Sequence, residues 1–510
     1  MTDQPQRVCE ILEFSARRWP EAVALRDGGD TITYLQLQQA TSQLADRLAV
    51  RGVGPGDRVV IVAENGLAQI AAFFATGALG AWPALVNARA SEREIAAIRA
   101  HARPRVVVYG TGASDDARVH AGRDAVETCA GLSPSPRSDC ALSAGDPAAM
   151  AETGALAASV GALIYTSGTT GAPKGVLATH RGLLSFAARS AAIRRLQPGE
   201  TVLGALPMSH IFGVATILLT TLTAGGSILL QPRFDADATV AALCRGQLSV
   251  LHGVPTLYVR LLDRLERDGL RGPFPGLRYA YAGGGALDPA LKRRIEAALA
   301  LPLHHGYGMT EYAGSMFVTH VDRPRHDALP GELAPDCEVR FVGPDERESP
   351  PGVPGEIWVR GPGTMLGYYR DPELTARTLT TDGWLRTGDL GYLEPDGALR
   401  IVSRARDLIK RSGFTVYPQE VEQQLVEHPR VRQAGVVGIP AESGDETIVA
   451  FVEARVADDR LDVRELSEFL RARLSHYKVP QHVVQVAELP LTANGKIRKQ
   501  ALRELWQARA

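Results

Sequence analysis

The sequence predicts an α/β protein with a large N-terminal domain of layered α/β subdomains and a barrel-like part, followed by a small α+β domain. Its 510 residues are too many for a single hydrophobic core. Short apolar runs alternate with helical patterns at the spacing of βαβ units, which build mainly parallel sheets. The pattern changes after residues 403–407, so we place one domain at residues 1–403 and another at residues 408–510.

The first 110 residues carry the alternation most clearly. They predict the elements in this order: a helix from residue 8, a strand pair near residues 24 and 31–33, a helix ending near residue 51, a strand at 59–63, a helix and strand within 66–86, a helix at 92–101 and a strand at 106–109. Residues 66–86 and 211–230 are long enough to span a bilayer. Both runs contain polar residues and glycines, so each predicts a buried helix followed by a strand and no transmembrane segment.

The middle of the chain predicts a connection and then further alternation. Residues 132–159 are rich in Pro, Ser, Ala and Asp, which indicates a surface connection. Strands are expected within 248–255 and at 277–282, and those at 340–341 and 355–360 would belong to the barrel-like part. The last hundred residues predict a helix at 419–427, strands at 431–439 and 448–456, a helix at 463–474 and a final strand. That length is sufficient for a small domain.

Composition indicates which binding partners and which cellular compartment to expect. The net charge of −1 gives no overall field to recruit nucleic acid or anionic lipid. Five scattered cysteines without a C-x-x-C pair favour a reducing cytoplasm, with no disulfide framework and no zinc site. Only six of the 56 Lys and Arg residues are lysine, so the lysines are candidates for sites that need a compact ammonium. Lys174, Lys410, Lys478 and Lys496 lie in motifs, whereas Lys292 and Lys499 are expected on the solvated surface.

The stretch at residues 165–176 reads YTSGTTGAPKGV and predicts a polyphosphate cradle. Glycines allow close approach of the backbone to a ligand, and successive amides form an anion-binding nest. Hydroxyls and the Lys174 ammonium add further donors. The spacing is not that of a Walker A loop, and a flexible surface loop is the alternative. The residues expected to bind a nucleotide here are Thr166, Ser167, Gly168, Thr169, Thr170, Gly171 and Lys174.

Four later segments carry further candidate chemistry. In HGYGMTE (305–311), a turn of Gly306, Tyr307 and Gly308 could press an aromatic face on a purine, and Glu311 could supply an oxygen ligand to Mg²⁺. In WLRTGDLG (384–391), Asp389 is expected in a tight turn as an acceptor for ribose hydroxyls. The other two segments are SRARDLIKRSGFTVYPQE (403–420) and LPLTANGKIR (489–498).

These five segments, in this order, resemble the adenylate-forming superfamily of acyl-CoA synthetases, firefly-type luciferases and peptide-synthetase adenylation domains. The resemblance covers essentially the whole chain. It implies that Thr310 and Glu311 contact AMP and the metal, with Thr170 also at the metal, and that Asp389 binds the ribose. It also implies that Lys496 bridges the substrate carboxylate and the α-phosphate as charge builds in the transition state.

The resemblance also implies which residues bind ATP and coenzyme A and which form the hinge for domain motion. Residues 404–407 become a hinge about Arg406, around which the small, mobile C-terminal domain swings. Ser403 stands where the family usually has Gly, and Arg406 where it usually has Asp or Lys. The remaining residues implied to contact ATP or coenzyme A are Gly283, Gly284, Gly285, Arg404, Lys410, Ser412, Gly413 and Phe414.

The segment PMSHIFG bears on the acid that is activated. It holds no acidic residue to pair with a substrate ammonium, which disfavours amino-acid substrates. His210 resembles the histidine beside the carboxylate pocket of acyl- and aryl-CoA ligases, with a core histidine as the alternative. Small or flexible apolar residues suit an apolar acyl or aryl group. The expected pocket residues are His210, Phe212, Gly213, Ala282, Gly283 and Met309.

The resulting prediction is an AMP-forming acid–thiol ligase that uses ATP, Mg²⁺ and coenzyme A. Three alternatives stay open: transfer to the phosphopantetheine arm of an acyl carrier protein, a luciferase-type oxygenase, and a nucleotide-binding regulatory module without turnover. No nucleic-acid partner is expected. A homodimer, the identity of the acid and the pathway are left open by the sequence.

Overall fold

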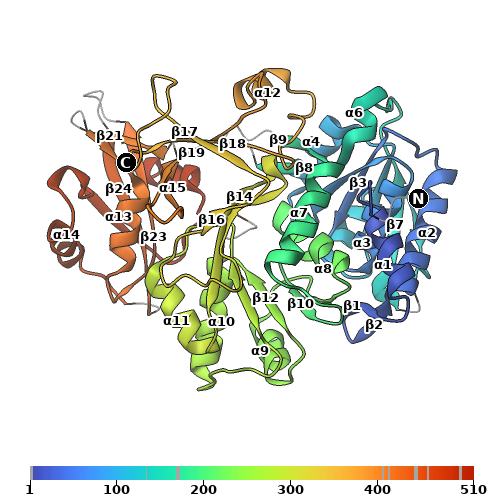
Figure 1. Cartoon of the computed structure of the whole chain (residues 1–510), viewed down its shortest axis with the longest axis horizontal. Helices are drawn as coiled ribbons and strands as arrows, with labels where there is room; N and C mark the ends of the chain where they lie inside the picture. The colour runs from blue at the N-terminus through green and yellow to red at the C-terminus, as the bar shows by residue number, and fades with distance from the viewer. Residues whose placement is uncertain are drawn as a thin grey trace.

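The computed structural model describes residues 4–133, 135–167, 173–404, 407–411, 414–440, 446–456, 459–492 and 497–509. In Figure 1 the chain runs from the blue N-terminal region at one end of the molecule to the red C-terminal region at the other. The described chain forms two large sheets, a four-stranded antiparallel sheet and a separate C-terminal group of strands and helices. This confirms the predicted α/β class and the small C-terminal domain.

A seven-stranded sheet lies at the N-terminal end. Alternate residues of its central strand β3 (Arg58–Ala63) join different cores, since Val59 and Ile61 belong to one apolar cluster and Val60 and Val62 to another. Both faces of the sheet are therefore covered, as expected for parallel strands. Across the sheet the strands are β6 (Val126–Cys129), β7 (Cys140–Ala144), β5 (Val106–Tyr109), β3, β4 (Trp82–Asn87), β8 (Val160–Ser167) and β9 (Pro173–Thr179).

Strand β7 contradicts the predicted surface connection at residues 132–159. It pairs antiparallel with β5, with Leu142 opposite Val108. The prediction failed because the five-residue strand CALSA is too short and too weakly apolar to stand out from its Pro- and Ser-rich flanks. The same stretch also contains the turn η1 (Pro136–Ser138) and the helix α6 (Gly154–Ser159).

A nine-stranded, mostly parallel sheet forms the centre of the molecule. The largest apolar core includes residues of both large sheets and of the helices between them. The strands, in order, are β16 (Glu332–Leu333), β15 (Gly314–Val318), β14 (Leu303–Met309), β13 (Tyr279–Ala282), β12 (Val250–Gly253), β10 (Thr201–Gly204), β11 (Ser227–Leu230), β1 (Val23–Asp27) and β2 (Asp30–Thr33). The helices of this part of the chain are α1 (Glu10–Arg18), α2 (Tyr34–Val50), α3 (Leu67–Ala78), α4 (Glu92–Ala102), α5 (Asp115–Ala121), α7 (His180–Ile193), the π-helix η2 (Phe212–Leu219), α8 (Thr220–Thr223), α9 (Ala236–Cys244), α10 (Pro255–Arg267), α11 (Pro289–Leu299) and the short turn η3 (Thr310–Tyr312).

The part expected to be barrel-like is a four-stranded antiparallel sheet with its own apolar cluster. Its strands, in order, are β17 (Glu338–Val342), β18 (Gly355–Arg360), β19 (Leu385–Leu393) and β20 (Leu399–Arg404), with α12 (Pro372–Thr378) between β18 and β19 in the chain. Strand β20 ends at Arg404, and the C-terminal domain, which we place at residues 408–510, follows it in the chain.

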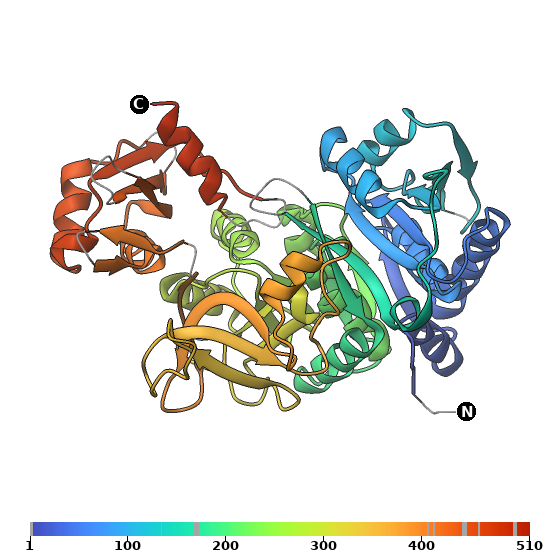
Figure 2. The same ribbon diagram turned by 90° about the horizontal axis from the view of Figure 1, so that it is seen from above.

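The C-terminal domain lies at the far end of the molecule from the N-terminal sheet, as Figure 2 shows from above. It has its own buried core, which includes Val421, Val436 and Leu470. Arg432 in this domain lies 3.6 Å from the carboxylate of Asp263 on α10. The elements are β21 (Ile409–Arg411), β22 (Phe414–Val416), α13 (Pro418–Val426), β23 (Val431–Pro440), β24 (Glu446–Ala454), α14 (Val463–Arg471), η5 (His476–Lys478), β25 (His482–Val486) and α15 (Lys499–Gln507).

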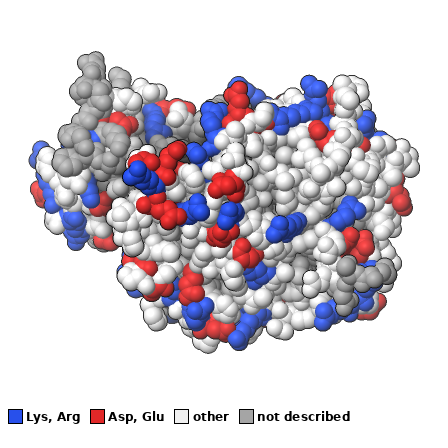
Figure 3. Space-filling view, turned by 45° about the horizontal axis from the view of Figure 1, so that its top comes forward, with Lys and Arg blue, Asp and Glu red and all other residues white. Residues whose placement is uncertain are grey.

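The two long uncharged runs are interior elements. The first forms α3 and β4, and the second forms η2, α8 and β11, as predicted. Within the described ranges, every helix is too short or too polar to cross a bilayer. Basic and acidic side chains are interspersed on the face shown in Figure 3, which agrees with the net charge of −1.

One lysine prediction is wrong. Lys292, expected on the solvated surface, is 1% exposed. Its ammonium donates a 2.8 Å hydrogen bond to the carbonyl of Arg325 and also contacts the carboxylate of Glu296. A buried ammonium is stable only with such partners, and a sequence pattern does not reveal them. Lys292 therefore acts as a structural cation of α11.

Candidate active site

One cleft, with a volume of about 2980 Å³, gathers most of the residues that the sequence singled out. It is lined by both the large domain and the C-terminal domain. The predicted site residues that line it are Thr166, Lys174, His210, Phe212, Gly283, Gly284, Gly285, Gly306, Tyr307, Gly308, Met309, Thr310, Glu311, Asp389 and Arg404. These residues come from segments 166 to 404, so the fold brings distant motifs to one surface.

Several predicted residues cannot be placed in this site. Gly168, Thr169, Thr170, Gly171, Arg406, Ser412, Gly413 and Lys496 lie outside the described residues. For Ser167, Lys410 and Phe414 only the backbone is described, within β8, β21 and β22.

Two predicted pocket residues lie behind the wall of the cleft. Gly213 is buried at the start of η2, where a Cβ would collide with the carbonyl of Pro207. Ala282 is fully buried at the end of β13, and its carbonyl accepts a 2.9 Å hydrogen bond from Nδ1 of His305. Both positions need a small residue for packing. Neither is among the residues that line the cleft.

The residues expected to stack on a purine and to bind a ribose are joined directly. The hydroxyl of Tyr307 donates a 2.6 Å hydrogen bond to Oδ2 of Asp389, while Nε of Arg404 lies 3.0 Å from Oδ1. Burial and then the Asp389 charge raise the pKa of Tyr307 well above its usual value, so the phenol stays protonated. The Asp389 charge raises the pKa of Arg404. Asp389 is 5% exposed and is held as an oriented acceptor.

Neither of these segments forms the predicted turn. Gly306, Tyr307 and Gly308 belong to β14, which pairs antiparallel with β15, and Asp389 lies within β19. A Cβ at Gly306 would collide with the Tyr281 hydroxyl, and one at Gly308 with the backbone of Gly314. The glycines are therefore required by close strand packing, although their clustering in the sequence indicated a turn.

A tyrosine that the sequence did not single out connects the phosphate-loop lysine with the predicted metal ligand. Nζ of Lys174 lies 5.9 Å from the ring centroid of Tyr368, within the range of a cation–π interaction. The Tyr368 hydroxyl donates a 2.8 Å hydrogen bond to Oε1 of Glu311. Burial, and next the Glu311 charge, raise the pKa of Tyr368. Backbone pairing of residues 366–369 with residues 175–177, including the bridge between Val176 and Tyr368, brings this tyrosine to the site, so no local sequence signal could have found it.

The residues present fit a magnesium ion held largely by phosphate oxygens. Glu311 offers an oriented carboxylate beside the cleft. Among the described residues, no group of three or more His, Cys, Asp or Glu side chains could hold a metal by itself. Mg²⁺ commonly binds through one or two carboxylates together with substrate phosphates.

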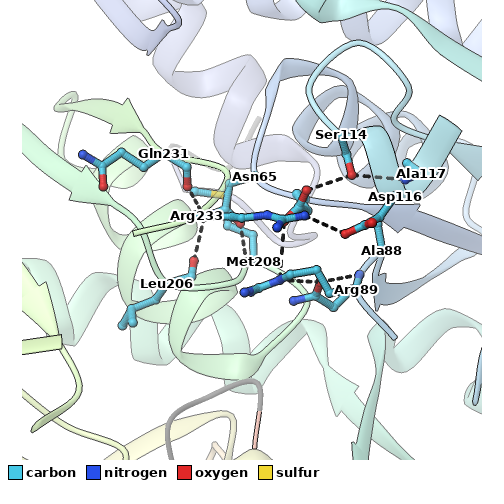
Figure 4. Close-up of polar contacts among 12 residues, drawn as sticks. Asn65, Ala88, Arg89, Ser114, Asp116, Ala117, Leu206, Met208, Gln231 and Arg233 are labelled. Atoms are coloured by element: carbon cyan, nitrogen blue, oxygen red, sulfur yellow. Dashed lines mark hydrogen bonds and ion pairs between the residues drawn. The ribbon is translucent and has the colours of Figure 1, made fainter. Parts of the chain in front are cut away.

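A buried asparagine fixes the backbone that leads to His210 (Figure 4). Asn65 follows β3, and its amide nitrogen donates to the carbonyls of Leu206 at 2.9 Å and Gly204 at 3.0 Å. Its Oδ1 accepts a 2.8 Å hydrogen bond from the amide of Met208. No sequence motif singled out Asn65. Its place immediately after a buried parallel strand was the available signal, because ligand sites gather at the carboxyl ends of such strands.

The adjacent Glu64 ties the same region to the neighbouring sheet. Its buried carboxylate accepts a 2.8 Å hydrogen bond from Ser114 and lies 3.0 Å from Nε of Arg233. Arg233 also reaches Asp116 at 2.6 Å. The hydrogen bond to Glu64 is the main cause of the raised pKa of Arg233. Strand ends from both large sheets are thereby held in one arrangement beside the cleft.

His210 itself has a defined orientation. Its Nδ1 accepts a 3.3 Å hydrogen bond from the amide of Phe212, so the neutral ring carries its proton on Nε2. The ring lines the cleft at the start of η2.

The C-terminal domain contributes cations to the opposite wall. Lys478 lies 2.6 Å from Oε1 of Glu420, and Lys499, expected on the open surface, lies 3.1 Å from Glu422. Both lysines line the cleft. Because each is paired with a carboxylate, neither provides an uncompensated charge.

Comparisons with known proteins agree along the whole chain. A family model described as AMP-binding enzyme matches residues 12–369, and one described as AMP-binding enzyme C-terminal domain matches residues 420–496. The sulfoacetate–CoA ligase of Cupriavidus necator is 32% identical over 495 residues, which are 96% of each protein. A feruloyl-CoA synthase of an Amycolatopsis species is 33% identical over 498 residues, again 96% of each. The solved O-succinylbenzoate coenzyme A synthetase of Bacillus subtilis, in complex with ATP and magnesium ion, superposes with a TM-score of 0.81 at 26% identity, covering 97% of this chain and 99% of that one.

Proposed function

Since the chain belongs to the AMP-binding enzyme family, we propose that it joins a carboxylic acid to coenzyme A in two steps. In the first, the acid attacks the α-phosphate of ATP, giving an acyl adenylate and pyrophosphate. In the second, the thiol of coenzyme A attacks the acyl carbon and AMP leaves. The full-length relatives include carboxylate–CoA ligases, and the chain is an enzyme of that class.

The observation that carries the proposal is the gathering of Lys174, Glu311 and the Asp389–Arg404 pair in one cleft with His210. Asp389 would accept the ribose hydroxyls. Lys174 would neutralise phosphate charge together with the loop at residues 166–171. His210 would lie beside the substrate carboxylate. These groups would position the two reactants for in-line attack, and such positioning supplies much of the rate enhancement in reactions of this kind.

Mg²⁺ would be held by Glu311 and phosphate oxygens, with Thr170 as a further oxygen ligand, and would supply charge neutralisation during the first step. Tyr368 would keep the Glu311 carboxylate oriented toward the cleft.

The C-terminal domain would serve both steps by turning about Arg406. Lys496 would stabilise the charge that builds in adenylation. Lys410 and the face at Ser412, Gly413 and Phe414 would line the approach of the thiol. The scattered cysteines of the sequence are the reason for placing the reaction in the cytoplasm.

The test is pyrophosphate release with a panel of fatty, aromatic and alicyclic acids, each with and without coenzyme A. The proposal expects release that depends on one class of acid, and thioester only when coenzyme A is present. Acid-dependent release that yields thioester only with a phosphopantetheinylated carrier protein would instead identify a carrier-protein ligase. No release with any acid would contradict the proposal.

Lys496→Ala tests the two-conformation assignment within the same assay. This variant should lose adenylation far more than thioester formation from preformed acyl adenylate, and the second half-reaction is its internal control. Equal losses in both half-reactions would contradict the assignment.

A further inference from the structure

The inner wall of the acid side of the cleft carries polar groups beside the apolar residues that the sequence suggested. Beyond His210, the cleft is bounded by η2, β13, β14 and β15. Phe212 and Met309 are apolar members of this wall. Its hydrogen-bonding members are Thr216, Tyr281, His305 and Ser315, all of which line the cleft.

Tyr281 is fixed at this wall with its hydroxyl beside Ser315. The Tyr281 Oη and Ser315 Oγ atoms lie 3.2 Å apart, and either can donate. The Tyr281 ring packs edge-to-face on Phe212, with centroids 5.9 Å apart. The absence of a side chain at Gly306 makes room for the phenol, since a Cβ there would collide with Oη.

The two hydroxyls cannot satisfy each other completely. Each carries one proton, and their mutual hydrogen bond uses only one of the two. One O–H therefore remains to donate to another acceptor, and acceptor lone pairs also remain. This pair is an incomplete hydrogen-bonding group at the end of the cleft.

His305 adds an acceptor to the same wall. Nδ1 donates a 2.9 Å hydrogen bond to the carbonyl of Ala282, which leaves Nε2 as the lone-pair nitrogen of the ring. Burial lowers the pKa of His305 to about 4, so the ring is neutral near pH 7. Tyr281, Ser315, His305 and Thr216 thus present donors and acceptors without a formal charge.

This wall has a specific consequence for the acid. A hydrocarbon group that displaces water from these atoms leaves their hydrogen bonds unmade, which costs about 1–3 kcal/mol for each buried polar group. Arg194 stacks 4.8 Å from the Tyr281 ring centroid but does not line the cleft, so a second carboxylate or a sulfonate would be desolvated without a cation in contact with it. A hydroxyl or carbonyl oxygen matches the uncharged hydrogen-bonding groups of the wall.

Resting on the proposed ligase function, we propose that the acid carries a neutral oxygen, as a hydroxyl or carbonyl, at its end remote from the carboxylate, and that Tyr281 and Ser315 bind it. Tyr281 is then a specificity-determining residue. The oxygen of such an acid accepts a hydrogen bond from the free O–H of the pair. Where that oxygen is a hydroxyl, it can also donate a hydrogen bond to Nε2 of His305.

The test compares acids in pairs that differ only in that oxygen: 4-hydroxycinnamate with cinnamate, 4-hydroxybenzoate with benzoate, and 9-oxodecanoate with decanoate. The readout is kcat/KM for pyrophosphate release. In at least one pair, the oxygenated acid should be favoured by about tenfold or more, because a site that hydrogen-bonds a substrate group rejects the analogue without it. Tyr281→Phe should reduce that preference to within about twofold by slowing the oxygenated acid. Ser315→Ala should also reduce this preference for the oxygenated acid, because it removes the other hydroxyl of the pair.

Tyr279→Phe is the matched control. Tyr279 lies on the same strand, with its ring stacked 6.4 Å from that of Tyr281, but it does not line the cleft. Its side chain is fully buried. The control should retain the preference of the parent enzyme.

Two results would overturn the inference alone: turnover that is equal or better with the deoxy acid in every pair, or a preference that both tyrosine variants leave intact. In either case acid-dependent pyrophosphate release would still support the ligase function. Absence of release with every acid would overturn both.

Discussion

The hydroxyl of Tyr307 donates a 2.6 Å hydrogen bond to Asp389, so β14 and β19 meet at one carboxylate beside the cleft. Arg404, directly opposite Asp389 in the strand pairing, reaches the other oxygen. A buried carboxylate with two such partners is held in a single orientation. Protein contacts alone therefore orient Asp389, the residue expected to bind the ribose.

Asp389→Asn should raise the KM for ATP by about tenfold or more while changing the KM for the acid much less. The substitution removes the charge that Arg404 pairs with and weakens the proposed ribose acceptor. Initial-rate kinetics with each substrate varied separately give the two constants. Asp382→Asn, on the exposed turn that precedes β19, is the control. Equal increases in both constants would argue against a nucleotide-specific role.

Asn65→Leu should lower the free energy of unfolding by about 3 kcal/mol and reduce kcat/KM for the acid. The change leaves the backbone groups of Gly204, Leu206 and Met208 without their partner, and each such buried group costs about 1–3 kcal/mol. Denaturant unfolding and acid-dependent kinetics measure the two effects.

Gln69→Met provides the comparison for Asn65. Gln69 is also buried, but neither polar atom of its side chain has a hydrogen-bond partner among the described residues. Its replacement should leave stability unchanged or raise it, because an unsatisfied buried amide is itself costly. Similar losses in the two variants would mean that burial, and not the hydrogen bonds of Asn65, is decisive.

Glu311→Gln should raise the Mg²⁺ concentration needed for half-maximal adenylation by more than tenfold. Tyr368→Phe should raise it by about tenfold, since partners that orient a metal ligand typically contribute that much. Rates measured against free Mg²⁺ at saturating ATP give the values. Glu338→Gln, which breaks an exposed ion pair with Arg360 on the four-stranded sheet, should have no effect. An unchanged Mg²⁺ dependence in Glu311→Gln would exclude it as a ligand.

Stability should fall as the pH drops below about 6.5. Burial is the main cause that lowers the pKa of each of His180, His304 and His305 to about 4. Between pH 6.5 and 4 the unfolded chain binds a proton at each of these positions and the folded chain does not. The free energy of unfolding therefore falls by about 1.4 kcal/mol for each histidine with each unit by which the pH drops. The melting temperature at pH 7.5 and 5.5 measures the loss.

His304→Phe should reduce the dependence of the free energy of unfolding on pH by the contribution of one histidine, about 1.4 kcal/mol per pH unit. The phenylalanine ring can replace the imidazole that stacks 4.7 Å from Tyr279, and Nδ1 of His304 has no partner among the described residues. A slope that does not change between the parent and this variant would remove His304 from the explanation.

The fold could largely be predicted because its main strands are continuous apolar runs, as in β3, where every residue is buried. Strand β7 could not, because its residues acquire their role only by pairing with β5. Part of the site could be predicted as well. Motif order brought Lys174, Glu311 and Asp389 forward as candidates, and the structure places them along one cleft.

The contacts that complete the site depend on tertiary structure. Tyr368 carries no local signal of its function, and Asn65 carries only its place after a buried strand. The glycines that indicated a turn at Tyr307 lie in a closely packed strand. Lys292 is a further example, since a lysine expected on the solvated surface proved to be buried. Residue type and spacing thus predicted the chemistry, whereas long-range contacts determine which side chains orient it.

The most direct test of the account is product stoichiometry in a single reaction with ATP, Mg²⁺, coenzyme A and an accepted acid. Chromatography with mass detection should find AMP, pyrophosphate and the acyl thioester of coenzyme A in equal amounts, with no ADP. ADP and phosphate in place of AMP and pyrophosphate, or AMP formed without any acyl transfer to a thiol, would contradict an AMP-forming acid–thiol ligase.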